Sequence, residues 1–185
     1  KHYGDEVTKT YPYAIVFAVE MAKERIDKAP QIEQMLETSK GYVKAGLIGM
    51  IISYYLRELG YKARNHMDGN YLLPVVFAAT QAGLGKIGRS GLLITEEYGP
   101  RVRLGVVTTE LELTTADNPA PPEVKDRCKN CLKCAQACPG NAISLGETEE
   151  VNGCLVWNKK EEACYEVWQK VGTDCGICIA ACPFS

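Results

Sequence analysis

Eight of the nine cysteines in this 185-residue chain fall into two runs near its end. The first run has spacings of three, three and four residues and closes with Cys-Pro; the second repeats that closure after a longer gap. The runs are Cys128, Cys131, Cys134 and Cys138, and then Cys164, Cys175, Cys178 and Cys182. Thiolates are soft, anionic ligands for iron, and closely spaced turns let one loop wrap three of them around a cluster. The pattern therefore predicts two 4Fe-4S clusters.

The cysteine before each proline is expected to ligate the other run's cluster. In two-cluster loops of this spacing the fourth cysteine starts a helix that carries its thiolate across. The first cluster is therefore assigned the ligands Cys128, Cys131, Cys134 and Cys182. The second cluster is assigned Cys138, Cys164, Cys175 and Cys178. Cys154 is left over; we expect a buried thiol there, with a substitute ligand or a partner contact as alternatives.

Structural zinc is the alternative for paired C-x-x-C sequences. Zinc takes four ligands from two such pairs and needs neither an interleaved cysteine nor a repeated Cys-Pro closure, so we disfavour it, and disulfides still more. Clusters of this kind require a reducing or anaerobic setting while they are inserted.

Composition excludes some partners. A hydrophobic content of 46% and a formal net charge of -2 are ordinary for a soluble domain and offer no basic surplus for nucleic acid. The most apolar stretch, Ala45 to Leu56, falls short of the roughly 18 residues needed to span a bilayer. We expect a cytoplasmic or membrane-associated protein, a choice that a chain starting without methionine leaves open.

Two domains are expected: residues 1–118, a layered α/β unit, and residues 119–185, which carry the cysteines. The continuous apolar run Tyr13–Glu20 predicts a central strand buried on both sides. A helix is expected to open at Pro30, and Ser39 to cap a second one from Gly41 to about Leu59, ended by Gly60. Further expected elements are a strand at Tyr61–Arg64, a helix at Leu72–Ala82, strands at Leu92–Thr95 and Val102–Thr109, and a stiff linker at Ala116–Pro122.

A glycine-rich turn lies in the first domain. Gly83, Gly85 and Gly88 fit G-x-G-x-x-G, but a helix precedes them and a strand follows, the reverse of a dinucleotide site. We expect instead a tight turn that lets a bulky ligand approach the backbone. His66, in a polar loop, is expected to have no special role.

The segment Gln81–Leu111, followed by the twin cysteine runs, resembles the corrinoid and iron-sulfur reductases. These comprise reductive dehalogenases and, more distantly, epoxyqueuosine reductases of tRNA modification. Glu97–Leu104 and the placing of Trp157 and Trp168 around Cys164 favour the dehalogenases. The resemblance implies an α+β protein: a nitroreductase-like α/β domain binding cobalamin with its lower base detached (base-off), then a ferredoxin-like domain with two 4Fe-4S clusters.

The resemblance also implies site residues. Dehalogenases use a tyrosine with a basic neighbour as proton donor, which by spacing points to Tyr42 with Arg101; an arginine beside a phenol favours its phenolate form. Epoxyqueuosine reductases use an aspartate, which points to Asp68. The cofactor-binding residues would be Gly83, Gly85, Gly88 and Arg89. The implied partners are a small-molecule substrate such as an organohalide and an electron donor such as ferredoxin or flavodoxin.

Two departures from the family bear on function. A layer of about one helix and loop before Tyr13 is missing, so we expect part of the corrinoid pocket to be absent or supplied elsewhere. No helical-repeat tail for gripping tRNA follows Cys182. The leading hypothesis is a corrinoid-dependent, dehalogenase-like reductase; the alternatives are a non-catalytic electron carrier and an epoxyqueuosine reductase.

Overall fold

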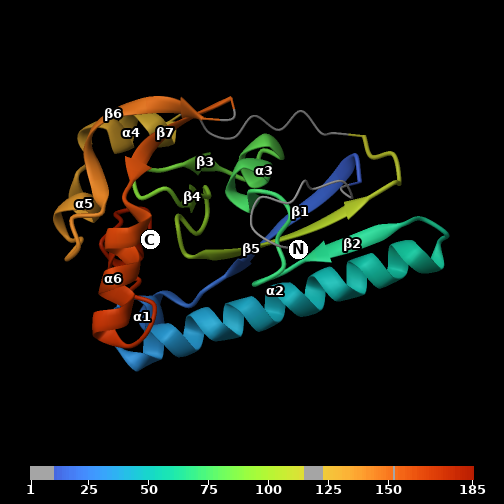
Figure 1. Ribbon diagram of the computed structural model, residues 1–185, viewed down its shortest axis with the longest axis horizontal. Helices are drawn as coiled ribbons and strands as arrows, with labels where there is room; N and C mark the ends of the chain where they lie inside the picture. Colours follow the sequence, from blue (N-terminus) through green and yellow to red (C-terminus); the bar gives the residue numbers. More distant parts are fainter. Residues whose placement is uncertain (1–10, 115–122, 152) are drawn as a thin grey trace.

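The computed structural model describes residues 11–114, 123–151 and 153–185, and Figure 1 shows a mixed α+β chain. A three-stranded antiparallel sheet of β1 (Tyr13–Glu20), β5 (Val102–Thr109) and β2 (Ala63–His66) is flanked by the long helix α2 (Ile32–Glu58). The remaining elements are α1 (Lys23–Ile26), α3 (Val75–Gln81), β3 (Lys86–Ile87), β4 (Leu93–Ile94), α4 (Glu123–Asn130), α5 (Lys133–Gln136), β6 (Ile143–Val151), β7 (Cys154–Lys159), α6 (Glu161–Val171) and α7 (Ile177–Ala180).

The central strand is β5 and not β1. The predicted bounds of both strands are confirmed, but β5 pairs with β1 along its length and with β2 on its other side. Val106 and Val107 of β5 are fully buried, whereas several residues of β1 are exposed. Because every pairing is antiparallel, one side of an edge strand can face water, which a parallel α/β layer would not permit.

Helix α2 is one element where the sequence predicted two. Ser39 lies inside it, since neither proline nor a turn interrupts the chain before Gly60, whose φ of +90° ends the helix as expected. The glycine at 41 is required by packing: a Cβ there would lie 2.7 Å from Cγ of Arg103. Among the residues of this helix, Ala45, Gly49 and Leu56 are buried, whereas Ile48 and Tyr55 are exposed.

The cysteine-bearing part, α4 to α7 with the hairpin of β6 and β7, packs against α1 and the first turn of α2. Fully buried Met21 and Ile26 form a core with Ile179 of α7, and Gln34 of α2 donates to Asp174 in the loop after α6. The predicted linker lies outside the described residues. Among the helices described, none is long and apolar enough to cross a membrane.

Two glycines of α2 are expected to respond oppositely to alanine. A Cβ at Gly49 would lie 2.0 Å from Oδ1 of Asn65, whose amide donates to the Gly46 carbonyl, so Gly49→Ala should lower the free energy of unfolding by about 1–3 kcal/mol. At Gly46 the nearest atom to an added Cβ is the terminal methyl of Met67 at 3.2 Å. Gly46→Ala should therefore change the free energy of unfolding by less than about 1 kcal/mol. Denaturant unfolding of both variants checks this; equal losses would contradict it.

Candidate functional site

The first predicted cysteine set surrounds one small cavity. Cys128 lies in α4, Cys134 in α5 and Cys182 just after α7, and with Cys131 they line a pocket that Arg89 and Phe184 also border. Burial, with the nearby thiols, raises the pKa of Cys182 to about 11 and also raises that of Cys128 and Cys134. Thiols held this way lose their protons only to a strongly bound cation, as metal ligation provides.

The second predicted set, Cys138, Cys164, Cys175 and Cys178, lines another cavity of about 200 Å³. Burial and neighbouring thiols raise the pKa of Cys178 to about 12; Cys134 of the first set is among those thiols, so the two sets adjoin. Helices α5 and α7 contact each other, and each is followed by the Cys-Pro of its run. This contact carries the last thiol of each run into the other set.

Cys154 is half-buried at the start of β7, opposite Val151 of β6, and is not among the residues lining either cavity. Trp157 is buried beside Cys128, and Trp168 borders the second cavity. Both tryptophans therefore pack around the cysteine sets.

Arg89, a predicted cofactor-binding residue, borders the cavity of the first cysteine set. Its guanidinium is buried and donates to four backbone carbonyls of the cysteine-bearing part. Nε bonds to Cys128 (3.1 Å), Nη1 to Ser144 (2.8 Å) and Gly146 (3.2 Å), and Nη2 to Lys129 (3.0 Å). The guanidinium also stacks on Trp157 at 4.8 Å from the ring centroid. Arg89 thus binds the sheet-bearing part to the cysteine-bearing part.

The glycine-rich turn is likewise explained by packing within the protein. Gly83 ends α3 with φ of +78°. A Cβ at Gly85 would lie 2.3 Å from the Ile94 carbonyl oxygen, and one at Gly88 would lie 2.7 Å from the Ile94 side chain. Strand β4 therefore makes the close approach that the structure shows, and the approach of a bulky ligand stays a prediction.

Tyr42 lies beside Arg103, not beside Arg101. The Arg103 guanidinium covers the Tyr42 ring at 4.7 Å from its centroid, and Nη2 lies 3.7 Å from a carboxylate oxygen of Asp174, the residue before Cys175. Gln34, which is fully buried, also donates to Asp174. A chain of contacts therefore links the second cysteine set to a phenol. Sequence reasoning passed over Arg103 and Asp174, although Arg103 shares the R-x-R pattern with Arg101.

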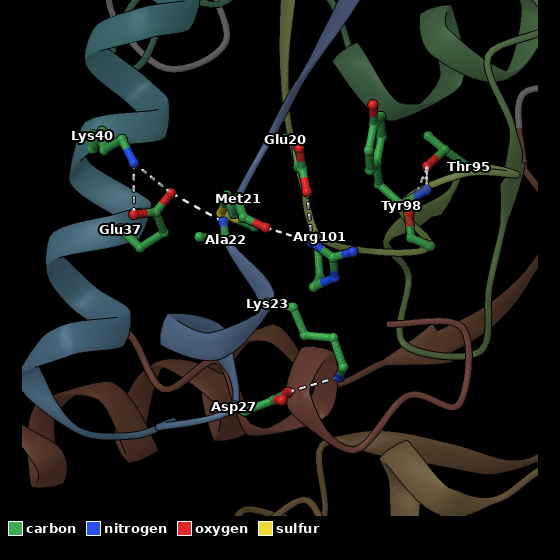
Figure 2. Close-up of polar contacts among 11 residues, drawn as sticks. Glu20, Met21, Ala22, Lys23, Asp27, Glu37, Lys40, Thr95, Tyr98 and Arg101 are labelled. Atoms are coloured by element: carbon green, nitrogen blue, oxygen red, sulfur yellow. Dashed lines mark hydrogen bonds and ion pairs between the residues drawn. The ribbon is translucent and has the colours of Figure 1, made fainter.

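The guanidinium of Arg101 is used elsewhere. It is buried, and Nη1 donates to the Met21 carbonyl at 2.6 Å and to Glu20 at 3.3 Å, holding the end of β1 (Figure 2). Figure 2 also shows Glu37 of α2 accepting from the Ala22 backbone N–H and from Lys40. These contacts fasten the β1–α1 corner and do not include Tyr42, so the assistance of Arg101 to Tyr42 stays a prediction.

A third cavity, of about 340 Å³, adjoins the second cysteine set. It shares Tyr42, Leu92, Arg103 and Ile179 with the cysteine-lined cavity and is otherwise largely apolar. Tyr71 also lines it; burial, then nearby Tyr42 and Asp68, raises its pKa, so this phenol keeps its proton. Asp68 thus lies within electrostatic reach of Tyr71.

His66 is the one histidine in the described part of the chain, and it is engaged at both ring nitrogens. Nδ1 accepts from the Leu72 backbone N–H at 3.3 Å, so Nε2 carries the hydrogen and donates to Thr108 Oγ1 at 2.9 Å. Burial lowers its pKa to about 4, so the ring is neutral near pH 7. It ties β2 to β5.

Comparison with known proteins agrees with this geometry. Residues 127–185 match the family model of the 4Fe-4S dicluster domain. The tetrachloroethene reductive dehalogenase of Desulfitobacterium hafniense is 36% identical over 92% of this chain and 32% of its own length. The epoxyqueuosine reductase of Gloeobacter violaceus is 33% identical over 58% of this chain and 34% of its own length.

A solved structure is also similar. The catabolic reductive dehalogenase NpRdhA superposes with a TM-score of 0.84 at 29% identity over 92% of this chain and 25% of that protein. The chain thus spans about a third of the length of the curated relatives it matches.

The contacts of Arg89 predict a large loss on its removal. Arg89→Met should lower the free energy of unfolding by about 2–4 kcal/mol, because four backbone carbonyls lose the donors of a buried guanidinium. Lys129→Met is the control, since only the backbone carbonyl of Lys129 takes part. Thermal unfolding of the two variants measures the difference, and an Arg89 variant as stable as the control would contradict the assignment.

Proposed function

Since this chain is homologous to the reductive dehalogenases over 92% of its length but spans about a third of theirs, we propose that it belongs to a corrinoid-dependent iron-sulfur oxidoreductase of the dehalogenase type. The observation that carries the proposal is the junction of two cavities. The cavity lined by the second cysteine set shares Tyr42 and Arg103 with the apolar cavity, so a source of electrons and a source of protons meet at one place.

The eight thiols fit two 4Fe-4S clusters. Each cavity offers four sulfur ligands, as such a cluster takes. The raised pKa values of Cys178 and Cys182 mean that these buried thiols would become thiolates only with a bound cation beside them. We assign the ligands as the spacing predicts, with Cys182 in the first set and Cys138 in the second. Electrons received at the first set would cross to the second near Cys134 and Cys178, where the sets adjoin.

The apolar cavity fits a small halogenated molecule and one edge of a corrinoid. A bound corrinoid supplies the strongly reducing centre at which a carbon-halogen bond is broken. The described residues form one wall of that site, from Leu73, Val75 and Leu104. Because both ring nitrogens of His66 are engaged within the protein, His66 would not be free to ligate a bound corrinoid, which on the family resemblance would be held base-off.

The protein's own contribution is a proton delivered beside the substrate. Tyr42 is the proposed donor, and the Arg103 guanidinium over its ring stabilises the phenolate left behind. Asp174 in turn holds Arg103. Tyr71, which stays protonated, would donate a hydrogen bond to a substrate atom or to the Tyr42 oxygen. Asp68 lies near Tyr71 and would act through it.

The metal content of the chain tests the proposal. Protein prepared without oxygen should contain about eight iron atoms per chain and no zinc, and should change the visible spectrum of added cobalamin. Cys138→Ser should lower the iron toward about four, because the second set loses a ligand. Cys154→Ser is the control and should leave the iron unchanged, since Cys154 borders neither cavity. Iron without cobalamin binding would leave only an electron carrier; zinc in place of iron would refute the proposal.

Tyr42→Phe tests the proton donor. The variant should lose about 10²- to 10⁴-fold in dehalogenation rate, the range of general acid catalysis, while its clusters and cobalamin still accept electrons. Tyr55→Phe, on the same helix but exposed, is the matched control and should keep full activity. Rates come from substrate loss, and cofactor reduction from the visible spectrum. Equal activity in the two variants would remove Tyr42 from the mechanism.

A further inference from the structure

Lys159 is a cation at the second cysteine set. It ends β7 and pairs with Ile143 of β6, and it lies two residues after buried Trp157, on the same face of the strand. Its side chain is 23% exposed and lines the same cavity as Cys138, Cys164, Cys175 and Cys178. The hairpin thus turns Trp157 toward the first set and the Lys159 ammonium toward the second.

The ammonium is only partly neutralised by protein groups. Its ion pair is with Glu161, 2.8 Å away, and that carboxylate is 75% exposed to water. The ion pair with a carboxylate keeps the Lys159 side chain charged. Because this largely covered side chain lines the same cavity as the four thiols, its charge acts on the second cysteine set.

We propose that Lys159 raises the reduction potential of the second cluster by holding its positive charge against that cluster's ligands, with exposed Glu161 partly offsetting the charge. The inference rests on the proposed cluster ligands. Reduction by one electron from an external reductant adds one negative charge, with no bond broken and no proton taken up. A nearby cation stabilises the reduced form more than the oxidised form, and half-burial weakens the screening by water.

A purely structural role makes a different prediction. The Lys159–Glu161 pair is partly exposed, and such pairs contribute little to stability. If the only role of Lys159 were to hold the end of the hairpin, its replacement would change the stability of the chain and leave both midpoint potentials unchanged. Reduction potentials therefore separate the two readings.

The test is an EPR-monitored redox titration of the cluster-loaded chain, prepared without oxygen. In Lys159→Met one of the two midpoint potentials should fall, and the other should move much less. Lys159→Arg keeps the charge and should restore the wild-type value. Glu161→Gln removes the opposing charge, so the same midpoint should rise. Lys160→Met is the matched control, an exposed neighbour outside the cavity lining, and should change neither potential.

The outcomes separate this inference from the proposed function. Unchanged midpoints in both Lys159→Met and Glu161→Gln, with wild-type iron content, would overturn the role of Lys159 and leave the clusters in place. If Lys159→Met loses iron, the Glu161→Gln variant, whose changed side chain is exposed, still decides. A higher midpoint potential in that variant supports the inference, and an unchanged midpoint potential overturns it. Wild-type protein without two reducible clusters would refute the proposed function and this inference together.

Discussion

The crowding of eight thiols into two adjoining cavities is the constraint on which the rest of the structure depends. Burial and mutual repulsion raise the pKa values of most of them, up to about 12 for Cys178, so they would resist becoming thiolates together. Metal ligation removes that difficulty and supplies folding free energy to a segment with a small core. Cations of the described residues line both cavities, Arg89 at the first and Lys159 and Arg103 at the second.

Those sets must be held rigidly against the sheet if electrons are to reach a substrate there. Arg89 does so with four hydrogen bonds to backbone carbonyls, and Met21 and Ile26 do so by packing against Ile179. A third link is polar, from Asp174 to Arg103. Because this link ends at the Tyr42 ring, the contact that joins the two parts of the chain also builds the proposed proton donor.

The site combines groups that are distant in the sequence. Tyr42 comes from a helix, Arg103 from the central strand and Asp174 from the loop before Cys175. Arg101 and Arg103 are two residues apart, yet one fastens the β1–α1 corner and the other covers a phenol. The difference arises because Arg101 precedes β5 and points to the end of β1, whereas the missing side chain at Gly41 lets Arg103 pass along α2.

The sequence by itself determined what depends on neighbouring residues: the sorting of eight cysteines into the two sets that the structure brings together, the bounds of β1 and β5, and the end of α2 at Gly60. Turn spacing, apolar runs and glycine conformation are local, so they can be recognised without a fold. Only the tertiary structure decided which strand is central, that Arg89 and the glycine-rich turn serve internal packing, and that Arg103 is the partner of Tyr42. Each of these depends on contacts between segments tens of residues apart, and such contacts follow from how the elements pack, which residue spacing does not encode.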